Sequence, residues 1–580
     1  MTFRFPAWRT TVPHLLAVSL LLLLWLTAWS AFSQGGKGRH WWWFQGNDAC
    51  QGFAAQSASI RLGAPVQTVV WPGATLATPY LYATVLAHKP TLPMSVESAE
   101  AVLDRAVQFH WAQAGVYGLA LLLVVYALGV RWSGSPALSF IASGLLASNT
   151  WFLYGLFHVR AEIPSLVFAL AACWWAIAER PRAWPLIRAV VFGVLITLAV
   201  LSKIQIAPVV LLAVFLFITA SRDLPCPTMA KWWTVSMWSA IALSIGGITC
   251  MVRTSAIDST TYGLGGLPST FANFTIALSL AALITAVLLA RSVRTRVRAI
   301  GSTALLISGG AVLALLVLVL PIAYHGGLSA ALASANRIAY GTVSFARYGL
   351  QLDAAGGWGL KSTVLDRVTS FVEFQKSSGL ISGSLALWSG MVVVSAMFAL
   401  ELFPSGWRQR LAPESLPPRQ PAITETPWAM PSMLFMTAVL CDVTTTHRTV
   451  STTSYAFYHI YSLPFYLLAV AAALGQIATV VPIKARRTAP IAMCSIVTLL
   501  VSATLLSGML ISNDRVRTWL EGEGPAVTYL PENGGSTNVV WGAAPQFGSL
   551  TTQTYKSMRE HILKREAAQL EAEKAKSTAK

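Results

Sequence analysis

Long apolar runs recur along almost the entire chain, and short polar or basic segments separate them. About thirteen of these runs approach the roughly 20 residues that an α-helix needs to cross a lipid bilayer. They lie at 13–33, 112–130, 137–157, 163–178, 187–202, 205–220, 232–252, 271–290, 301–323, 380–402, 429–446, 460–481 and 489–510. A segment that crosses hydrocarbon must satisfy its backbone groups internally, so each run predicts a helix. The pattern therefore predicts an all-α, polytopic transmembrane bundle of about 13 spans.

The composition supports a membrane protein and argues against nucleic-acid binding. The 580 residues are 55% hydrophobic and 11% charged, whereas about a quarter of the residues in a soluble chain are charged. A net charge of +18 would indicate a nucleic-acid partner in a soluble protein, but basic residues in a membrane protein are topology signals. The six cysteines show no CxxC or Cys/His spacing, so neither a zinc site nor a disulfide framework is predicted.

The basic residues also predict which side of the membrane each loop faces. If the N-terminus lies in the cytoplasm, every short loop placed inside is basic, whereas short loops placed outside hold few Lys and Arg. Most of the 23 carboxylates then fall on the outer side. The large outer segments are 34–110, 324–379 and 511–580. A basic start before an apolar run is also typical of a secretory signal, but the length of the first run favours a retained span.

The first outer segment carries a candidate catalytic carboxylate. Trp41, Trp42 and Trp43 precede Asp48, and indole rings favour the boundary between headgroups and water. An Asp after Asn47 is common in turns, but a carboxylate held there is also suited to act as a general base on an attacking hydroxyl. An interfacial helix is expected at 51–62, followed by the turn Trp71-Pro72-Gly73 and a helix that bears Tyr80 and Tyr82.

Further polar candidates lie where apolar runs end. His158, Arg160 and Glu162 join the third and fourth runs, and an Arg at a membrane edge is often only a snorkelling side chain beside its counter-ion. Lys203 and Gln205 occupy a short link, where the lysine is either a second snorkelling residue or a point charge for a phosphate. The other candidates are Arg253, Arg448, Tyr458 and His459. The last two also fit an ordinary aromatic belt.

These motifs together resemble the GT-C glycosyltransferases, which are integral membrane enzymes that use polyprenyl-phosphate sugars. The resemblance lies in a first-loop acid (Asp48), an amphipathic helix and a Pro-Gly turn before a Tyr-rich helix. The protein O-mannosyltransferase-like and aminoarabinose-transferase-like branches belong to this group. The resemblance covers the topology and roughly residues 40–210, and a weaker resemblance is present at 440–470. Many members carry two adjacent acids in the first loop, whereas this chain has Asn47 before Asp48.

The resemblance implies transfer of a sugar from a polyprenyl-phosphate donor to an acceptor hydroxyl of a lipid or glycan on the outer face. It implies that Asp48 is the general base and Glu162 a second catalytic residue. The residues implied to bind the donor phosphate are Lys203, Arg160, Arg253 and Arg448. The residues implied to line the substrate are His158, Gln205, Tyr458 and His459. No cofactor is expected; a divalent metal would suit Glu162, but no His, Asp and Glu spacing supports one.

The apolar runs, the distribution of Lys and Arg, the compact loops and the expected polyprenyl chemistry suggest the organisation and location of the protein. Residues 1–510 are expected to form the transmembrane catalytic module, and 511–580 a polar tail on the outer face, although an error of one span would place the tail inside. The expected location is a bacterial inner membrane, with a cytoplasmic N-terminus and an outward-facing site; the endoplasmic reticulum is the alternative.

Two other functions stay open at the sequence level. A transporter or flippase of lipid-linked glycans would carry ionisable residues near the middle of its spans or show two matching halves. An outward-facing oligosaccharide polymerase or ligase would depend on the large loop 324–379 more than on Asp48. The absence of a Rossmann or P-loop fingerprint fits a reaction that needs no nucleotide.

Overall fold

The computed structural model describes a set of helical segments and single positions of the chain. These are residues 8–36, 74–87, 96–157, 159–178, 185–221, 301–324, 327, 328, 331, 335, 389, 390, 392–394, 429–445, 459–480, 571 and 574. No strand occurs among them. The described part of the chain is therefore all-α, as the apolar runs predict.

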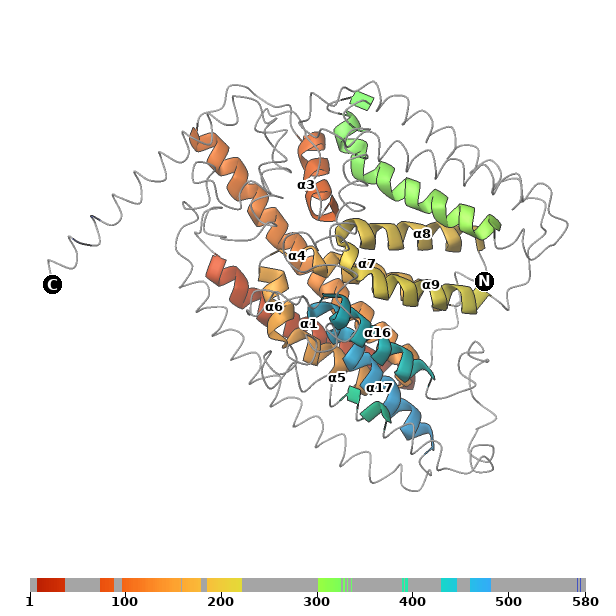
Figure 1. Ribbon diagram of the computed structural model, residues 1–580. Coiled ribbons are helices and arrows are strands. Elements are labelled where there is room, and N and C mark those ends of the chain that lie inside the picture. Colours follow the sequence, from red (N-terminus) through yellow and green to blue (C-terminus); the bar gives the residue numbers. More distant parts are fainter. Residues whose placement is uncertain are drawn as a thin grey trace, which may run out of the picture. The chain divides into compact units, whose positions relative to one another are not determined.

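The helices follow the predicted runs closely (Figure 1). The labelled elements are α1 (Trp8–Gly36), α3 (Ala74–Ala87), α4 (Val96–Ser133), α5 (Pro136–Ala147), α6 (Thr150–Phe157), α7 (Glu162–Ile177), α8 (Pro185–Ser202), η3 (Ile204–Ile206), α9 (Ala207–Ser221), α16 (Ala429–Thr445) and α17 (Leu463–Val480). A further helix covers Gly301–Tyr324. The helix expected to carry Tyr80 and Tyr82 is α3, which confirms that prediction.

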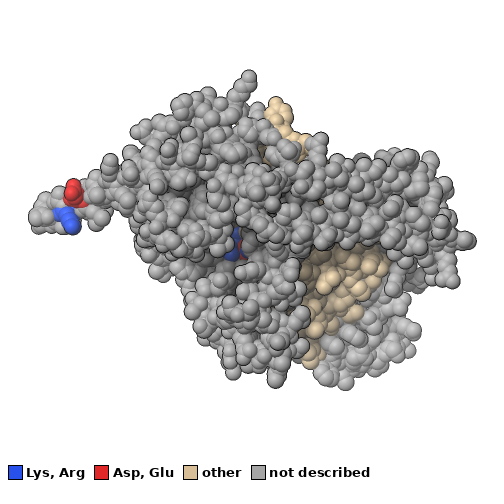
Figure 2. Space-filling view, turned by 45° about the horizontal axis from the view of Figure 1, so that its top comes forward, with Lys and Arg blue, Asp and Glu red and all other residues tan. Residues whose placement is uncertain are grey.

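Three described helices are long and apolar enough to cross a membrane: Asp104–Ser133, Gly301–Tyr324 and His459–Gln476. Several shorter apolar helices accompany them. On the face drawn in Figure 2, almost all described residues are uncharged, and large apolar side chains such as Leu16, Leu211 and Ile218 are more than half exposed. These features are those of a membrane protein. The runs at 232–252, 271–290 and 489–510 lie outside the described residues, so the number of spans stays a prediction.

Two helices differ from the predicted runs. α4 begins at Val96 instead of near 112, because Ala and Glu favour a helix and Val102, Ala106 and His110 place a buried stripe at helical spacing. The run at 137–157 is broken into α5 and α6 at Ser148. The Ser148 hydroxyl donates to the Leu145 carbonyl at 3.1 Å, and such local side-chain bonds compete with the regular helix.

The chain forms two compact units. Unit 1 comprises Met1–Gly35, Ala114–Pro227 and Ser344–Thr518; unit 2 comprises Gly36–Gln113, Thr228–Val343 and Trp519–Lys580. In unit 2, α3 packs against the first part of α4, with the Tyr80 and Phe109 rings 5.0 Å apart. The Thr78 hydroxyl also donates to the Leu318 carbonyl at 3.4 Å. All the polar clusters considered below belong to unit 1.

Within unit 1, α1 runs antiparallel to α4. The His14 Nδ1 and Tyr126 hydroxyl lie 2.8 Å apart near the start of α1, whereas the Trp25 indole donates to the Gly115 carbonyl at 3.1 Å further along it. The chain therefore leaves α1 at the Gly115 end of α4. Asp48 follows in the sequence but lies outside the described residues.

α5 and α6 together run back along α4 towards the same end. Ser139, near the start of α5, lies against Gly129, and Leu156, near the end of α6, lies against Gly118. The two short helices together therefore run once along the length of α4, as the single predicted run requires. Glycine at both contact points lets the helices approach closely, which is a common device in membrane bundles.

α7, α8 and α9 then alternate in direction. The start of α7 meets the end of α8, where the Ser165 hydroxyl donates to the Ala199 carbonyl at 2.9 Å. The opposite end of α7 meets the start of α8, where the Arg188 guanidinium donates to the Ala176 carbonyl at 2.9 Å. α9 packs along α7. Arg160 and Lys203 therefore lie at the Gly118 end of the bundle, and Arg188 at the opposite end.

α16 and α17 complete the described part of unit 1 as an antiparallel pair. Gly475, late in α17, packs against the backbone of Ser133, so the start of α17 points towards the Gly118 end. Asp442, near the end of α16, contacts His459 and Tyr466 there. We call this end of unit 1 the polar end; it carries Arg160, Glu162, Lys203, Asp442 and His459. The side of a membrane that it faces stays a prediction.

The contact at Gly475 can be tested by adding a single methyl group. Gly475→Ala is expected to lower the free energy of unfolding by about 1–3 kcal/mol, because the new Cβ would overlap the Ser133 backbone. Gly309→Ala is the matched control, since nothing lies within 4 Å of the Cβ position there. Thermal unfolding of the two purified variants measures the difference. Equal melting temperatures would show that α17 does not pack on Ser133 as described.

Candidate functional site

The link between α6 and α7 is strained. The Arg160 N–H donates to the Gly155 carbonyl at 2.9 Å and the Val159 N–H to the Leu156 carbonyl at 3.2 Å, which is the pattern of a Schellman cap. Glycine usually occupies the left-handed position of this cap, but here buried Val159 takes it with φ 50°. A β-branched residue at positive φ is costly, and such strain concentrates at functional sites. The cap directs the chain so that Arg160 directly precedes α7.

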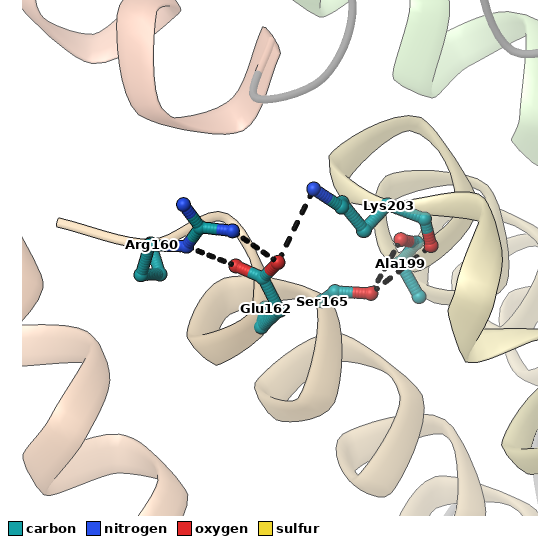
Figure 3. A network of polar contacts seen from close by, with 5 residues as sticks. All are labelled: Arg160, Glu162, Ser165, Ala199 and Lys203. Atoms are coloured by element: carbon teal, nitrogen blue, oxygen red, sulfur yellow. Dashed lines mark hydrogen bonds and ion pairs between the residues drawn. The ribbon is translucent and has the colours of Figure 1, made fainter. Parts of the chain in front are cut away.

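Arg160, Glu162 and Lys203 form one buried cluster, which we call the ion cluster (Figure 3). The Glu162 Oε1 atom lies 3.2 Å from an Arg160 Nη atom and 3.2 Å from the Lys203 Nζ atom. Its Oε2 atom accepts from the Arg160 Nε at 3.3 Å. The three residues are 9%, 1% and 6% exposed. Three separate sequence candidates therefore meet in space.

Ser165 connects α7 to the link between α8 and η3 that carries Lys203. Its hydroxyl lies 2.9 Å from the Ala199 carbonyl and 3.4 Å from the Lys203 carbonyl (Figure 3). The Lys203 N–H donates to the Ala199 carbonyl at 3.1 Å, so α8 ends directly at the lysine. Sequence reasoning missed Ser165. A serine in the first turn of an otherwise apolar helix was the available signal, because a buried hydroxyl seeks a backbone acceptor.

The charges of the ion cluster do not cancel. The formal charges of the three residues add up to one positive. Buried cations are costly unless anions or hydrogen-bond acceptors surround them, and a ligand anion is one such partner. A phosphate suits such a site, because both Arg and Lys bind phosphate oxygens well.

Gln205 adds an uncharged buried acceptor that is close to the ion cluster in the sequence. It lies in η3, two positions after Lys203, and its side-chain oxygen is buried with no hydrogen-bond partner among the described residues. An unpaired buried acceptor costs about 1–3 kcal/mol. A ligand hydroxyl that donates to it would remove this cost. The arrangement therefore suits a polar, hydroxyl-bearing ligand beside a phosphate.

A second buried cluster joins α16 and α17. The Asp442 Oδ1 atom lies 2.7 Å from the His459 Nδ1 atom, and its Oδ2 accepts from the Tyr466 hydroxyl at 2.8 Å. The Ser462 hydroxyl lies 3.0 Å from the same His459 nitrogen and donates to the His459 carbonyl at 3.0 Å. We call these four residues the Asp–His cluster. Sequence reasoning singled out His459 but gave Asp442, Ser462 and Tyr466 no role.

The structure thus places five of the predicted site residues in unit 1 at the polar end. Arg160, Glu162 and Lys203 contact one another, and Gln205 is their neighbour in the sequence. His459 contacts Asp442 instead. The remaining candidates lie outside the described residues: Asp48, His158, Arg253, Arg448 and Tyr458. Their roles stay predictions.

Within the described segments, no group of three or more His, Cys, Asp and Glu residues is arranged to hold a metal ion. Comparisons with models of known protein families, with curated proteins and with solved structures find no match to this chain.

Proposed function

We propose that this protein is a membrane glycosyltransferase that moves a sugar from a polyprenyl-phosphate donor to an acceptor hydroxyl of a lipid or glycan. The single observation that carries the proposal is the ion cluster, in which two buried cations meet one carboxylate at one end of a helix bundle. A lipid-borne phosphate is an anion that can reach such a place directly from the bilayer. We further propose that the polar end faces the outer side of the membrane.

Each residue of the ion cluster has a distinct role in the proposal. Lys203 and Arg160 bind the phosphate, and their positive charge stabilises the negative charge that grows on it as the sugar leaves. Glu162 holds both cations in place through its two oxygens. Gln205 accepts a hydrogen bond from a hydroxyl of the sugar. Arg253 and Arg448 are proposed as additional phosphate ligands.

Asp48 is proposed as the general base. It removes the proton of the acceptor hydroxyl while the hydroxyl oxygen forms its bond to the anomeric carbon of the sugar. The bond from that carbon to the phosphate oxygen breaks, and its electron pair stays on the polyprenyl phosphate. The chain leaves α1 at the polar end, which supports the assignment, since Asp48 follows α1 in the sequence.

The distribution of buried charge favours an enzyme over a transporter. Transporters of ionic substrates carry ionisable residues near the middle of their spans. In the described helices of unit 1, the buried charged groups lie near helix ends instead. Glu162 begins α7 and Lys203 follows α8 at the polar end, whereas Arg188 lies at the other end.

The proposal is tested by the masses of surface glycolipids and glycans in three strains: intact, gene-deleted, and Asp48→Asn with its protein level checked. Deletion is expected to remove one sugar mass from one product, and Asp48→Asn is expected to remove the same mass. An Asp48→Asn profile equal to the intact one would assign the base elsewhere. A deletion that changes no glycan while the protein is expressed would overturn the glycosyltransferase proposal.

A further inference from the structure

We propose that His459 is a general acid for the proposed transfer, donating a proton to the departing phosphate, and that Asp442 is its positioning residue. This inference rests on the proposed function and adds a second proton-transfer group to it. The inference is based on the Asp–His cluster, in which the Asp442 carboxylate makes a short contact with the His459 ring.

The hydrogen bonds fix how His459 holds its protons. An ionised carboxylate only accepts hydrogen bonds, so the His459 Nδ1 atom at 2.7 Å from Asp442 must carry a proton. When both ring nitrogens of His459 are protonated, the second proton sits on Nε2. His459 is therefore prepared to donate a proton from its Nε2 side, as paired histidines in enzymes do.

The carboxylate itself is held in a fixed position. The Tyr466 hydroxyl donates to one of its oxygens while His459 occupies the other. Asp442, Ser462 and Tyr466 are almost completely buried and His459 is 5% exposed. A buried ion pair is weak evidence for stability, because apolar residues of similar volume usually serve as well or better. A carboxylate that orients a histidine ring in this way is instead a known catalytic arrangement.

The location of the pair agrees with that role. Asp442 lies in the last turn of α16 and His459 begins the turn before α17, so the pair is at the polar end and not in the middle of a span. α16 packs against η3, whose residues directly follow Lys203. The phosphate proposed to bind Lys203 would thus have a proton donor on the neighbouring helix pair.

The proton balance of the step is complete. The imidazolium gives its Nε2 proton to an oxygen of the phosphate as the bond to the anomeric carbon breaks. The electron pair of that bond stays on the phosphate, so the polyprenyl phosphate leaves as a monoanion instead of a dianion. The proton of the acceptor hydroxyl goes to Asp48, as proposed above. His459 ends neutral and regains a proton from water.

Among the described residues, the titratable groups on the two helices of this pair near His459 are Asp442 and Cys441 of α16, and Tyr461 and Tyr466 of the helix that begins at His459. The other elements packed on this helix pair, α5 and α9, contain no titratable residue, and Lys203 precedes η3. A pH dependence that His459→Asn removes is therefore assigned to His459.

The inference is tested by binding of undecaprenyl phosphate to the purified full chain in lipid nanodiscs at about pH 6 and about pH 8, either side of the ordinary imidazole range. The wild type is expected to bind about tenfold to a hundredfold more tightly than His459→Asn at the lower pH. At the higher pH the two are expected to bind equally. Asp442→Asn, which keeps the shape of the side chain, is expected to lose part of the same advantage.

The matched control is His14→Asn, which removes a histidine that also contacts a buried hydroxyl, that of Tyr126. It is expected to bind like the wild type at both pH values. Wild-type binding with no difference in His459→Asn at either pH would overturn the inference and leave the proposed function standing. No binding by the wild type would overturn both. For the transfer itself, loss of rate at rising pH is expected in the wild type and not in His459→Asn.

Discussion

Glu162→Ala is expected to lower the free energy of unfolding by about 3–5 kcal/mol, because it leaves two buried cations without their shared carboxylate. Glu162 is 1% exposed, so water cannot replace the lost oxygens. The variant is expected to accumulate poorly in membranes and to unfold early. The measurement is the thermal unfolding of the purified variant in detergent micelles, together with its level in the membrane.

An apolar version of the ion cluster separates stability from function. The triple variant Arg160→Met, Glu162→Leu and Lys203→Met removes all three charges together, and replacing a buried ion group by apolar residues of similar volume is usually neutral or stabilising. It is expected to fold as well as the wild type and to have no transfer activity. A Glu162→Ala variant that is as stable as this triple variant would show that the three charges are not coupled.

Lys203→Met is expected to preserve the fold and to lower the transfer rate by about 10²–10³-fold, the usual effect of removing one donor to a developing anion. The fold survives because Glu162 keeps two contacts to Arg160, at 3.2 and 3.3 Å. Of the two cations of the ion cluster, only Arg160 is then left to bind a phosphate. The measurement is the amount of glycosylated product per amount of protein in the gene-deleted strain carrying the variant.

Two further variants give this experiment its controls. Lys203→Arg keeps the positive charge and is expected to retain part of the activity, although Arg and Lys differ in shape and are not interchangeable. Arg105→Met removes an exposed arginine whose Nε donates to the Ala101 carbonyl, and it is expected to leave the rate unchanged. A Lys203→Met variant with full activity would remove Lys203 from the proposed phosphate site.

The candidate site was only partly accessible to sequence reasoning. Arg160, Glu162 and Lys203 each stood out as a charged residue at the end of an apolar run, where charge is expensive and therefore informative. The sequence did not show that Lys203 would meet the same carboxylate as Arg160. That contact depends on the antiparallel return of α8 along α7, which the Ser165 hydroxyl fixes.

Asp442 shows why some functional residues escape detection. In the sequence it follows Cys441 near the end of an apolar run and fits an ordinary boundary residue. Its partners His459 and Tyr466 lie across a loop, and only the pairing of α16 with α17 brings them within 2.7 and 2.8 Å of its oxygens. No local sequence pattern predicts these contacts between helices, because hydrophobic periodicity indicates which residues are buried and not which residues they contact.

The sequence by itself determined the class of the protein and the approximate positions of its described helices. Those properties follow from the free-energy cost of placing polar backbone groups in hydrocarbon. This cost applies to each residue along the chain separately. Only the tertiary structure decided that the polar residues gather at one end of unit 1. It also decided that they form two separate clusters, because the contacts across helices depend on how each pair packs.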